Sequence, residues 1–142
     1  MRAASVALAV MSVITGCLGP AGTQFRTSLP EPGVVKPFPI VLGDETGLVV
    51  RVEPGPIDPS ARIELTVRED PTNPSAIIAI WLGGAIDDEA ALSFRRVLSG
   101  YALSLDVHRG FGSSTGEGIY RSLRIVTTEP VSVESITVSG GR

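Results

Sequence analysis

Residues 90–108 read AALSFRRVLSGYALSLDVH, and the apolar side chains of this run fall mainly at every second position. A period of two is that of a β-strand with one face on a core. The break at Ser99-Gly100 predicts a hairpin with a two-residue loop, and a loop of that length fixes how the two strands pair. Pairing Leu98 with Tyr101 puts the apolar rows of both strands on the same side.

A helix over residues 87–98 is the alternative, because the acidic run Asp87-Asp88-Glu89 could begin a helix. A helix there leaves the alternating stretch 101–107 without a strand to pair with. The hairpin accounts for both halves of the run and is therefore the preferred prediction.

Short runs of the same kind lie on both sides of the hairpin, separated by turn signals in a chain with 16 glycines and 11 prolines. Further strands are expected over 48–52, 62–68, 76–82, 119–127 and 131–138, and a turn over 44–47.

Two of these strands have distinctive patterns. Residues 76–82 are apolar on both faces, which is typical of a central strand. In 131–138 the first two valines are out of phase with Ile136 and Val138, which indicates a bulge. The sequence therefore predicts an all-β fold: a single antiparallel β-sandwich, immunoglobulin-like or similar, of about eight strands, with a small barrel as the alternative.

The N-terminus has the features of an export signal. Met1-Arg2 supplies a positive start, and the uncharged stretch 3–16 is too short to span a bilayer, which takes about 20 residues. It ends in Ile14-Thr15-Gly16-Cys17, which resembles the lipobox of bacterial lipoprotein precursors. The resemblance implies cleavage before Cys17 and attachment of lipid to that residue.

The domain organisation follows from this resemblance. We expect a signal peptide over 1–16, the lipidated cysteine with a Pro/Gly-rich tether over 17–37, and the β-sandwich over 38–142. The resemblance implies export and anchoring to a membrane. Leu18, where retained lipoproteins often have Asp, favours the outer membrane in a Gram-negative cell; with a single membrane the protein would lie at the cell surface.

Composition limits the partners. The formal net charge is −3 and no basic cluster occurs, which argues against nucleic acid as a partner and against a polybasic membrane patch. Cys17 is the only cysteine, so no disulfide within the chain is possible. The partners to consider are the lipid bilayer, reached through acylated Cys17, and an envelope protein or glycan.

One motif suggests catalysis. Gly112-Ser113-Ser114-Thr115-Gly116 has the spacing of a nucleophile elbow, which needs a following helix and a later histidine. A strand is expected to follow, and the only histidine, His108, comes earlier. A loop of small residues accounts for the match, so no catalytic residue, metal or cofactor is predicted.

The remaining polar candidates form at most a weak ligand or partner surface. A metal site with His108, Asp87 and Asp88 would need three or more ligands in fixed geometry, so solvated side chains are the simpler interpretation; a calcium site of the acidic run is the alternative. Arg96 is the one polar member of an apolar row: an edge residue, an ion-paired buried cation or an anion site. Trp81 is expected in the core, with a sugar-stacking platform as the alternative.

The function that these observations favour is a non-catalytic interaction or structural module held at the membrane. A carbohydrate- or cell-wall-binding domain is the alternative, and a hydrolase is the third possibility. The sequence assigns no role to the glycine-rich loop 110–118 or to the run Trp81-Leu82-Gly83-Gly84.

Overall fold

The structure is a computed structural model that describes residues 22–30, 37–84, 87–110 and 118–140. These residues form nine strands and one short 3-10 helix, η3. The elements are β1 (Thr23–Leu29), β2 (Phe38–Asp44), β3 (Val49–Pro54), β4 (Thr66–Glu69), β5 (Ala76–Gly83), β6 (Asp87–Val97), β7 (Gly100–Arg109), β8 (Ile119–Thr127), η3 (Val133–Ser135) and β9 (Ile136–Gly140).

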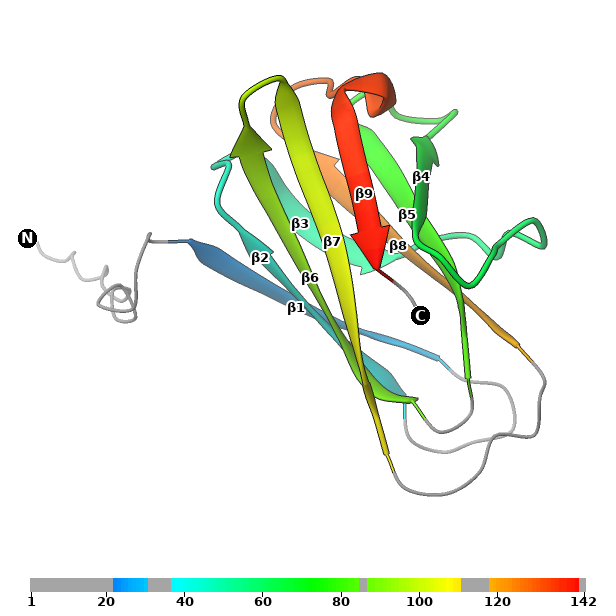
Figure 1. Ribbon diagram of the computed structural model, residues 1–142. Coiled ribbons are helices and arrows are strands. Elements are labelled where there is room, and N and C mark those ends of the chain that lie inside the picture. Colours follow the sequence, from blue (N-terminus) through cyan, green and yellow to red (C-terminus); the bar gives the residue numbers. More distant parts are fainter. Residues whose placement is uncertain (1–21, 31–36, 85–86, 111–117, 141–142) are drawn as a thin grey trace, which may run out of the picture.

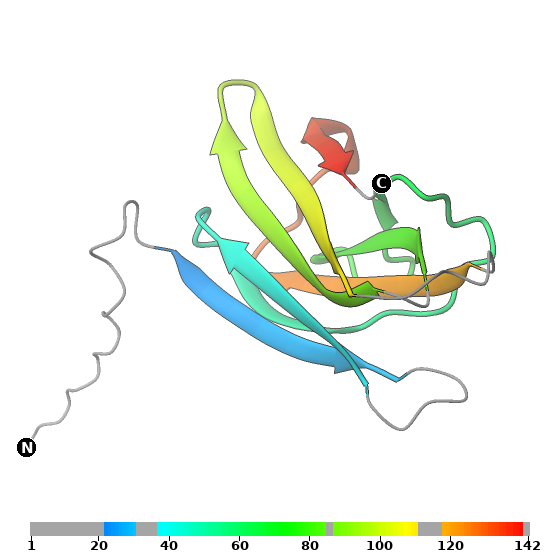
Figure 2. The ribbon, with the colours of Figure 1, turned by 60° about the horizontal axis from the view of Figure 1, so that its bottom comes forward.

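The strands form two sheets that pack face to face (Figures 1 and 2). One sheet has the order β1-β2-β6-β7-β9 and the other β3-β8-β5-β4. The β-sandwich prediction is therefore confirmed, and the two sheets do not close into a barrel. Two pairs of the five-stranded sheet, β2–β6 and β7–β9, run parallel, where the prediction was antiparallel throughout. Each parallel pair is joined by chain that passes through the other sheet, which supplies the long crossover that parallel strands need.

The predicted hairpin exists, with a different register. The turn is Leu98-Ser99, and Val97 pairs with Gly100 instead of Leu98 with Tyr101. The shift moves the pairing by two residues, so every side chain keeps its face. Its cause lies at Gly100, where φ is +151° and an added Cβ would overlap the carbonyl oxygen of Ser135. Gly100 is therefore needed where the strand meets η3. The helix alternative for 87–98 is wrong.

Two strand predictions are only partly right. The strand expected over 62–68 begins at Thr66, and Ile63 is exposed because the chain before Leu65 is still crossing from β3. The strand expected over 131–138 begins at Ile136. The change of phase in that segment comes from the 3-10 turn of η3 and not from a bulge.

A strand lies inside the segment predicted as a tether. All seven residues of β1 pair with β2, from Thr23 opposite Asp44 to Leu29 opposite Phe38. The side chain of Leu29 is buried and that of Phe25 packs against the core. Only the part of the predicted tether before Thr23 lies outside this strand on the N-terminal side, so the folded unit begins well before residue 38.

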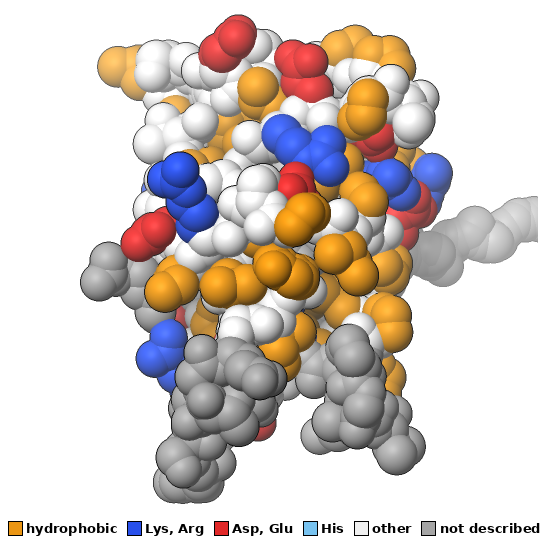
Figure 3. Space-filling view, turned by 90° about the vertical axis from the view of Figure 1, so that its right-hand side faces the viewer, with side chains coloured by type: hydrophobic (Ala, Val, Ile, Leu, Met, Phe, Trp, Pro, Cys, Tyr) orange, Lys and Arg blue, Asp and Glu red, His pale blue; other side chains and the backbone are white. Residues whose placement is uncertain are grey.

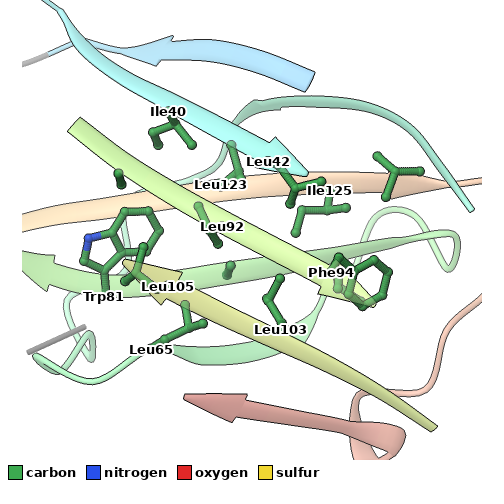
Figure 4. Close-up of a cluster of buried hydrophobic side chains, with 14 of the residues drawn as sticks. Ile40, Leu42, Leu65, Trp81, Leu92, Phe94, Leu103, Leu105, Leu123 and Ile125 are labelled. Atoms are coloured by element: carbon green, nitrogen blue, oxygen red, sulfur yellow. The ribbon is translucent and has the colours of Figure 1, made fainter. Parts of the chain in front are cut away.

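The core lies between the two sheets and is built from the apolar rows that period two predicts (Figure 4). Trp81 and Phe94 lie toward opposite ends of it, each with no exposed surface. Burying a side chain of this kind contributes about 1.5–3 kcal/mol relative to leaving it in water. The labelled core residues come from both sheets and, with Leu65, from the end of the connection before β4: Ile40, Leu42, Leu65, Trp81, Leu92, Phe94, Leu103, Leu105, Leu123 and Ile125.

The outer face of the four-stranded sheet is also covered. Because β3 and β4 lie at its opposite edges, the connection 55–65 has to cross a face of that sheet. It crosses the outer one, where Asp58 Oδ2 lies 2.9 Å from Nε of Arg68 on β4. Ile78 and Ile80 point to that side and are nevertheless buried, which explains why 76–82 is apolar on both faces.

Candidate functional site

The residues predicted as a weak ligand surface do not come together. Arg96 lies near the turn of the β6–β7 hairpin, where it pairs with Tyr101. Asp87, Asp88 and His108 lie at the other end of the same two strands, and Trp81 is inside the core. No single site can therefore include all five.

The acidic and histidine side chains form a small cluster at the open end of the hairpin. His108 Nδ1 lies 3.5 Å from Asp88 Oδ2, and both side chains are mostly exposed. The side chain of Asp87 is largely buried and accepts a hydrogen bond from the N–H of Gly84 at 2.8 Å, which ties the end of β5 to the start of β6. Among the described residues no group of three or more histidine, cysteine or acidic side chains could hold a metal ion.

Trp81 belongs to the core. Its side chain has no exposed surface, and its Nε1 has no hydrogen-bond partner among the described residues. Tyr101 stacks on Phe94 with ring centroids 5.4 Å apart, and Tyr120 pairs with Leu82 on the other sheet. Trp81, Tyr101 and Tyr120 are thus separated and do not form one aromatic surface on which a sugar could stack.

A buried cation is the main feature that the sequence interpretation missed. Arg121 is 1 % exposed, and its guanidinium carbon lies 3.5 Å from the ring centroid of Phe38, a cation–π contact. Its Nη2 donates to the carbonyl oxygen of Gly84 at 3.2 Å. An added Cβ at Gly83 would overlap Nε of Arg121. The run Trp81-Leu82-Gly83-Gly84 therefore has a structural role: it admits this guanidinium beside the backbone.

A charged network lies on the outer face of the four-stranded sheet. Arg124 Nε is 2.7 Å from Asp70 Oδ2, and its Nη1 is 3.3 Å from Glu53 Oε2. The pKa of Asp70 is lowered, first by hydrogen bonds from the backbone and hydroxyl of Thr72 and then by Arg124. The network joins β3, β8 and the turn before β5.

The other members of this network titrate in the directions that ion pairing predicts. Hydrogen bonds from Arg51 and Arg124 lower the pKa of Glu53, and the carboxylates of Asp70 and Glu53 raise the pKa of Arg124. Near it, Ser60 and then Arg68 lower the pKa of Asp58. Because every cation here has an acidic partner, the network serves stability.

The same outer side carries exposed apolar side chains. Ile57 is 74 % exposed and Ile63 53 %, both on the connection 55–65, and Tyr120 at the start of β8 is 46 % exposed. The backbone of that connection is bonded to β5 beside Tyr120, through the N–H of Leu82 and the carbonyl of Arg62 at 2.6 Å. Figure 3 shows hydrophobic side chains gathered in a band across the side of the molecule that is on the right in Figure 1. We call Ile57, Ile63 and Tyr120 the apolar face.

Three predicted features lie outside the described residues: the signal peptide over 1–16, the lipobox with Cys17, and the Gly-x-Ser-x-Gly run 112–116. Within the described ranges the structure contains no helix with the length and apolar character of a membrane span. The chain matches no protein-family model, no curated protein and no solved structure. The chemistry of its surface is therefore the basis for a functional proposal.

Proposed function

We propose that the chain is a lipid-anchored protein of the bacterial cell envelope, whose β-sandwich binds another envelope protein through its apolar face and carries out no catalysis. The anchor rests on the resemblance of Ile14-Thr15-Gly16-Cys17 to a lipobox. The binding role rests on one observation, the exposure of Ile57, Ile63 and Tyr120 on one side of the molecule. Exposed apolar side chains gathered on one side of a domain, as the band in Figure 3 shows, are typical of a partner surface.

The chemistry of the apolar face favours a protein partner over a glycan. Sugar rings stack on exposed aromatic side chains, whereas two of its three members are isoleucines. Trp81 is buried and Tyr101 is stacked on Phe94, so neither adds an aromatic surface beside Tyr120. An aliphatic face fits apolar side chains of a protein.

The position of the apolar face suits an anchored domain. The chain enters the sandwich at Thr23, on the left in Figure 1, and the apolar face is on the right. A domain held from the side of β1 would therefore keep this face open to a partner.

Site-specific photo-crosslinking of the full-length chain in its own bacterium tests the proposal. A photoreactive residue at Ile57 should give a discrete protein adduct, and Ile63→Asp in the same chain should abolish it because a charge would be buried in the contact. The matched control is the photoreactive residue at Arg26, which is exposed on β1.

Equal adducts from positions 57 and 26, or an adduct that survives Ile63→Asp, would refute the binding role. An adduct that carries glycan instead of protein would favour the carbohydrate-binding alternative. Mass spectrometry of the protein from the same membranes tests the anchor: acylated Cys17 should be the first residue, and an intact Met1 would contradict it.

A further inference from the structure

The β6–β7 hairpin ends in an exposed apolar residue next to two cations. Leu98 is fully exposed at the turn, and the side chains of Arg95 and Arg96 just before it are also exposed. The turn of the hairpin lies at one end of the sandwich, and Figure 2 shows it standing clear of η3 and of the end of β2. We call Arg95, Arg96 and Leu98 the hairpin tip.

The base of the hairpin tip is held in place by its neighbours. Gly100 presses against the carbonyl of Ser135 in η3, with no room for a side chain. Arg96 Nη2 donates to the carbonyl of Thr46 at 3.3 Å, and its guanidinium lies 5.6 Å from the ring centroid of Tyr101. These contacts fix the position of the turn, so Leu98 is exposed on a turn that is held by its neighbours.

The hairpin tip and the start of the folded chain lie at the same end of the five-stranded sheet. Thr23 pairs with Asp44, and Asp44 pairs with Phe94 on β6, so β1 begins level with Phe94. Leu98 is four residues further along, or about 13 Å at the rise of a strand.

The lipidated cysteine can reach the level of the hairpin tip. Six residue steps separate Cys17 from Thr23, and an extended chain of that length spans at most about 20 Å. This reach exceeds the rise from Phe94 to Leu98. A bilayer that holds lipid on Cys17 is thus within reach of the hairpin tip.

We infer that the hairpin tip is a second membrane contact, with Leu98 entering the apolar part of the bilayer and Arg95 and Arg96 on lipid phosphates. The inference rests on the proposed anchoring at Cys17. Arg guanidinium groups suit phosphate oxygens, and an exposed leucine between them and the bilayer gains by leaving water. An anionic phospholipid offers both a phosphate for the arginines and an apolar chain for the leucine, and it is therefore the ligand that we infer.

Acidic side chains at the same end limit the contact to the hairpin tip. Glu45, Glu129 and Glu134 are all exposed there, on the turn after β2, before Val131 and in η3. Anionic lipid would repel them. In Figure 2 the turn of the hairpin stands clear of η3 and of the end of β2, so the inferred contact is confined to the hairpin tip and does not include the whole end of the domain.

The test uses the mature chain, residues 17–142, coupled through its only thiol, Cys17, to a maleimide lipid in phosphatidylglycerol–phosphatidylcholine vesicles. The reporter is the tryptophan of a Leu98→Trp variant, because the native Trp81 is fully buried and gives a constant background. We expect a blue shift of the reporter's emission and quenching of that emission by brominated lipid. Both effects should weaken when phosphatidylglycerol is omitted or when Arg95 is changed to Gln.

The matched control is Tyr120→Trp, at an exposed position toward the other end of the molecule, whose emission should not respond to brominated lipid. A reporter at the hairpin tip that stays unquenched on tethered vesicles would overturn the inference. So would a blue shift that appears without lipid and follows protein concentration, since that indicates a second copy. Because the tether here is chemical, this result is separate from whether Cys17 is acylated in the cell.

Discussion

At the scale of single residues, Gly83 is a position where the structure leaves no room for a side chain. Gly83→Ala would push a methyl group into Nε of Arg121 and to 3.0 Å from Asp87 Oδ2. Because the guanidinium is buried against Phe38, it cannot swing into water, and the variant should lose about 1–3 kcal/mol of unfolding free energy, the usual cost of overpacking. Urea denaturation followed by Trp81 fluorescence measures this loss.

Gly43→Ala is the control, because the nearest atom to its added Cβ is the carbonyl oxygen of Leu92 at 3.9 Å. Its stability should stay within about 1 kcal/mol of the parent or rise, since alanine restricts the unfolded chain. Equal losses in the two variants would contradict the assigned role of Gly83.

Two arginines show what a residue pattern can and cannot predict. Arg96 was singled out as the polar member of an apolar row, and it is exposed because the hairpin runs past the core. Arg121 is in phase with Leu123 and Ile125 and was overlooked, yet it is the buried cation. The signal was present in the alternation of 119–127. The local pattern could not show that the guanidinium contacts the ring of Phe38, which lies 83 residues earlier in the chain.

At the scale of elements, β1 is the strand that was not predicted, because the proline and glycine content of its surroundings indicated a tether. The run from Leu18 to Pro39 has five prolines, but none of them falls between Thr23 and Leu29. Leu29→Ala should cost about 2–4 kcal/mol of unfolding free energy, because Leu29 is buried and a cavity would remain. Chemical denaturation of the purified variant checks this.

Ser28→Ala, on the exposed side of the same strand, should change stability by no more than about 0.5 kcal/mol. If Leu29→Ala behaves like Ser28→Ala, the segment is a tether after all.

The other elements fall into two groups: those that the local sequence pattern predicts, and those whose bounds or register depend on contacts with distant residues. Period two predicted the hairpin and β8, because alternation indicates a strand with one buried face. A continuous apolar run predicted the central strand β5, which is buried on both faces. The register of the hairpin, the start of β4 and the turn of η3 depend on contacts with distant chain: Ser135 against Gly100, and Gly140 as acceptor for the N–H of Leu65. No local pattern reports those.

At the scale of the whole molecule, the sandwich was predictable and its connections were not. The parallel pairs β2–β6 and β7–β9 arise because the chain changes sheets between their members, and this order decides which strands become edges. It also sends the connection 55–65 over the outer face, where it presents Ile57 and Ile63. The apolar face is thus a consequence of topology.

The pH dependence of global stability tests how the four-stranded sheet is held. The pKa of Asp70 lies below its usual value in the folded chain, so its contribution is complete above about pH 4, the unfolded value, and is lost as pH falls through the folded value. Asp70→Asn should therefore lower the unfolding free energy at pH 7 by about 1–3 kcal/mol and flatten its decline in acid. Thr72→Val removes one hydrogen bond to the carboxylate and should move the acid limb to higher pH. Urea midpoints between pH 2.5 and 7 distinguish these cases; an acid limb with the same slope in Asp70→Asn as in the parent would place the acid sensitivity elsewhere.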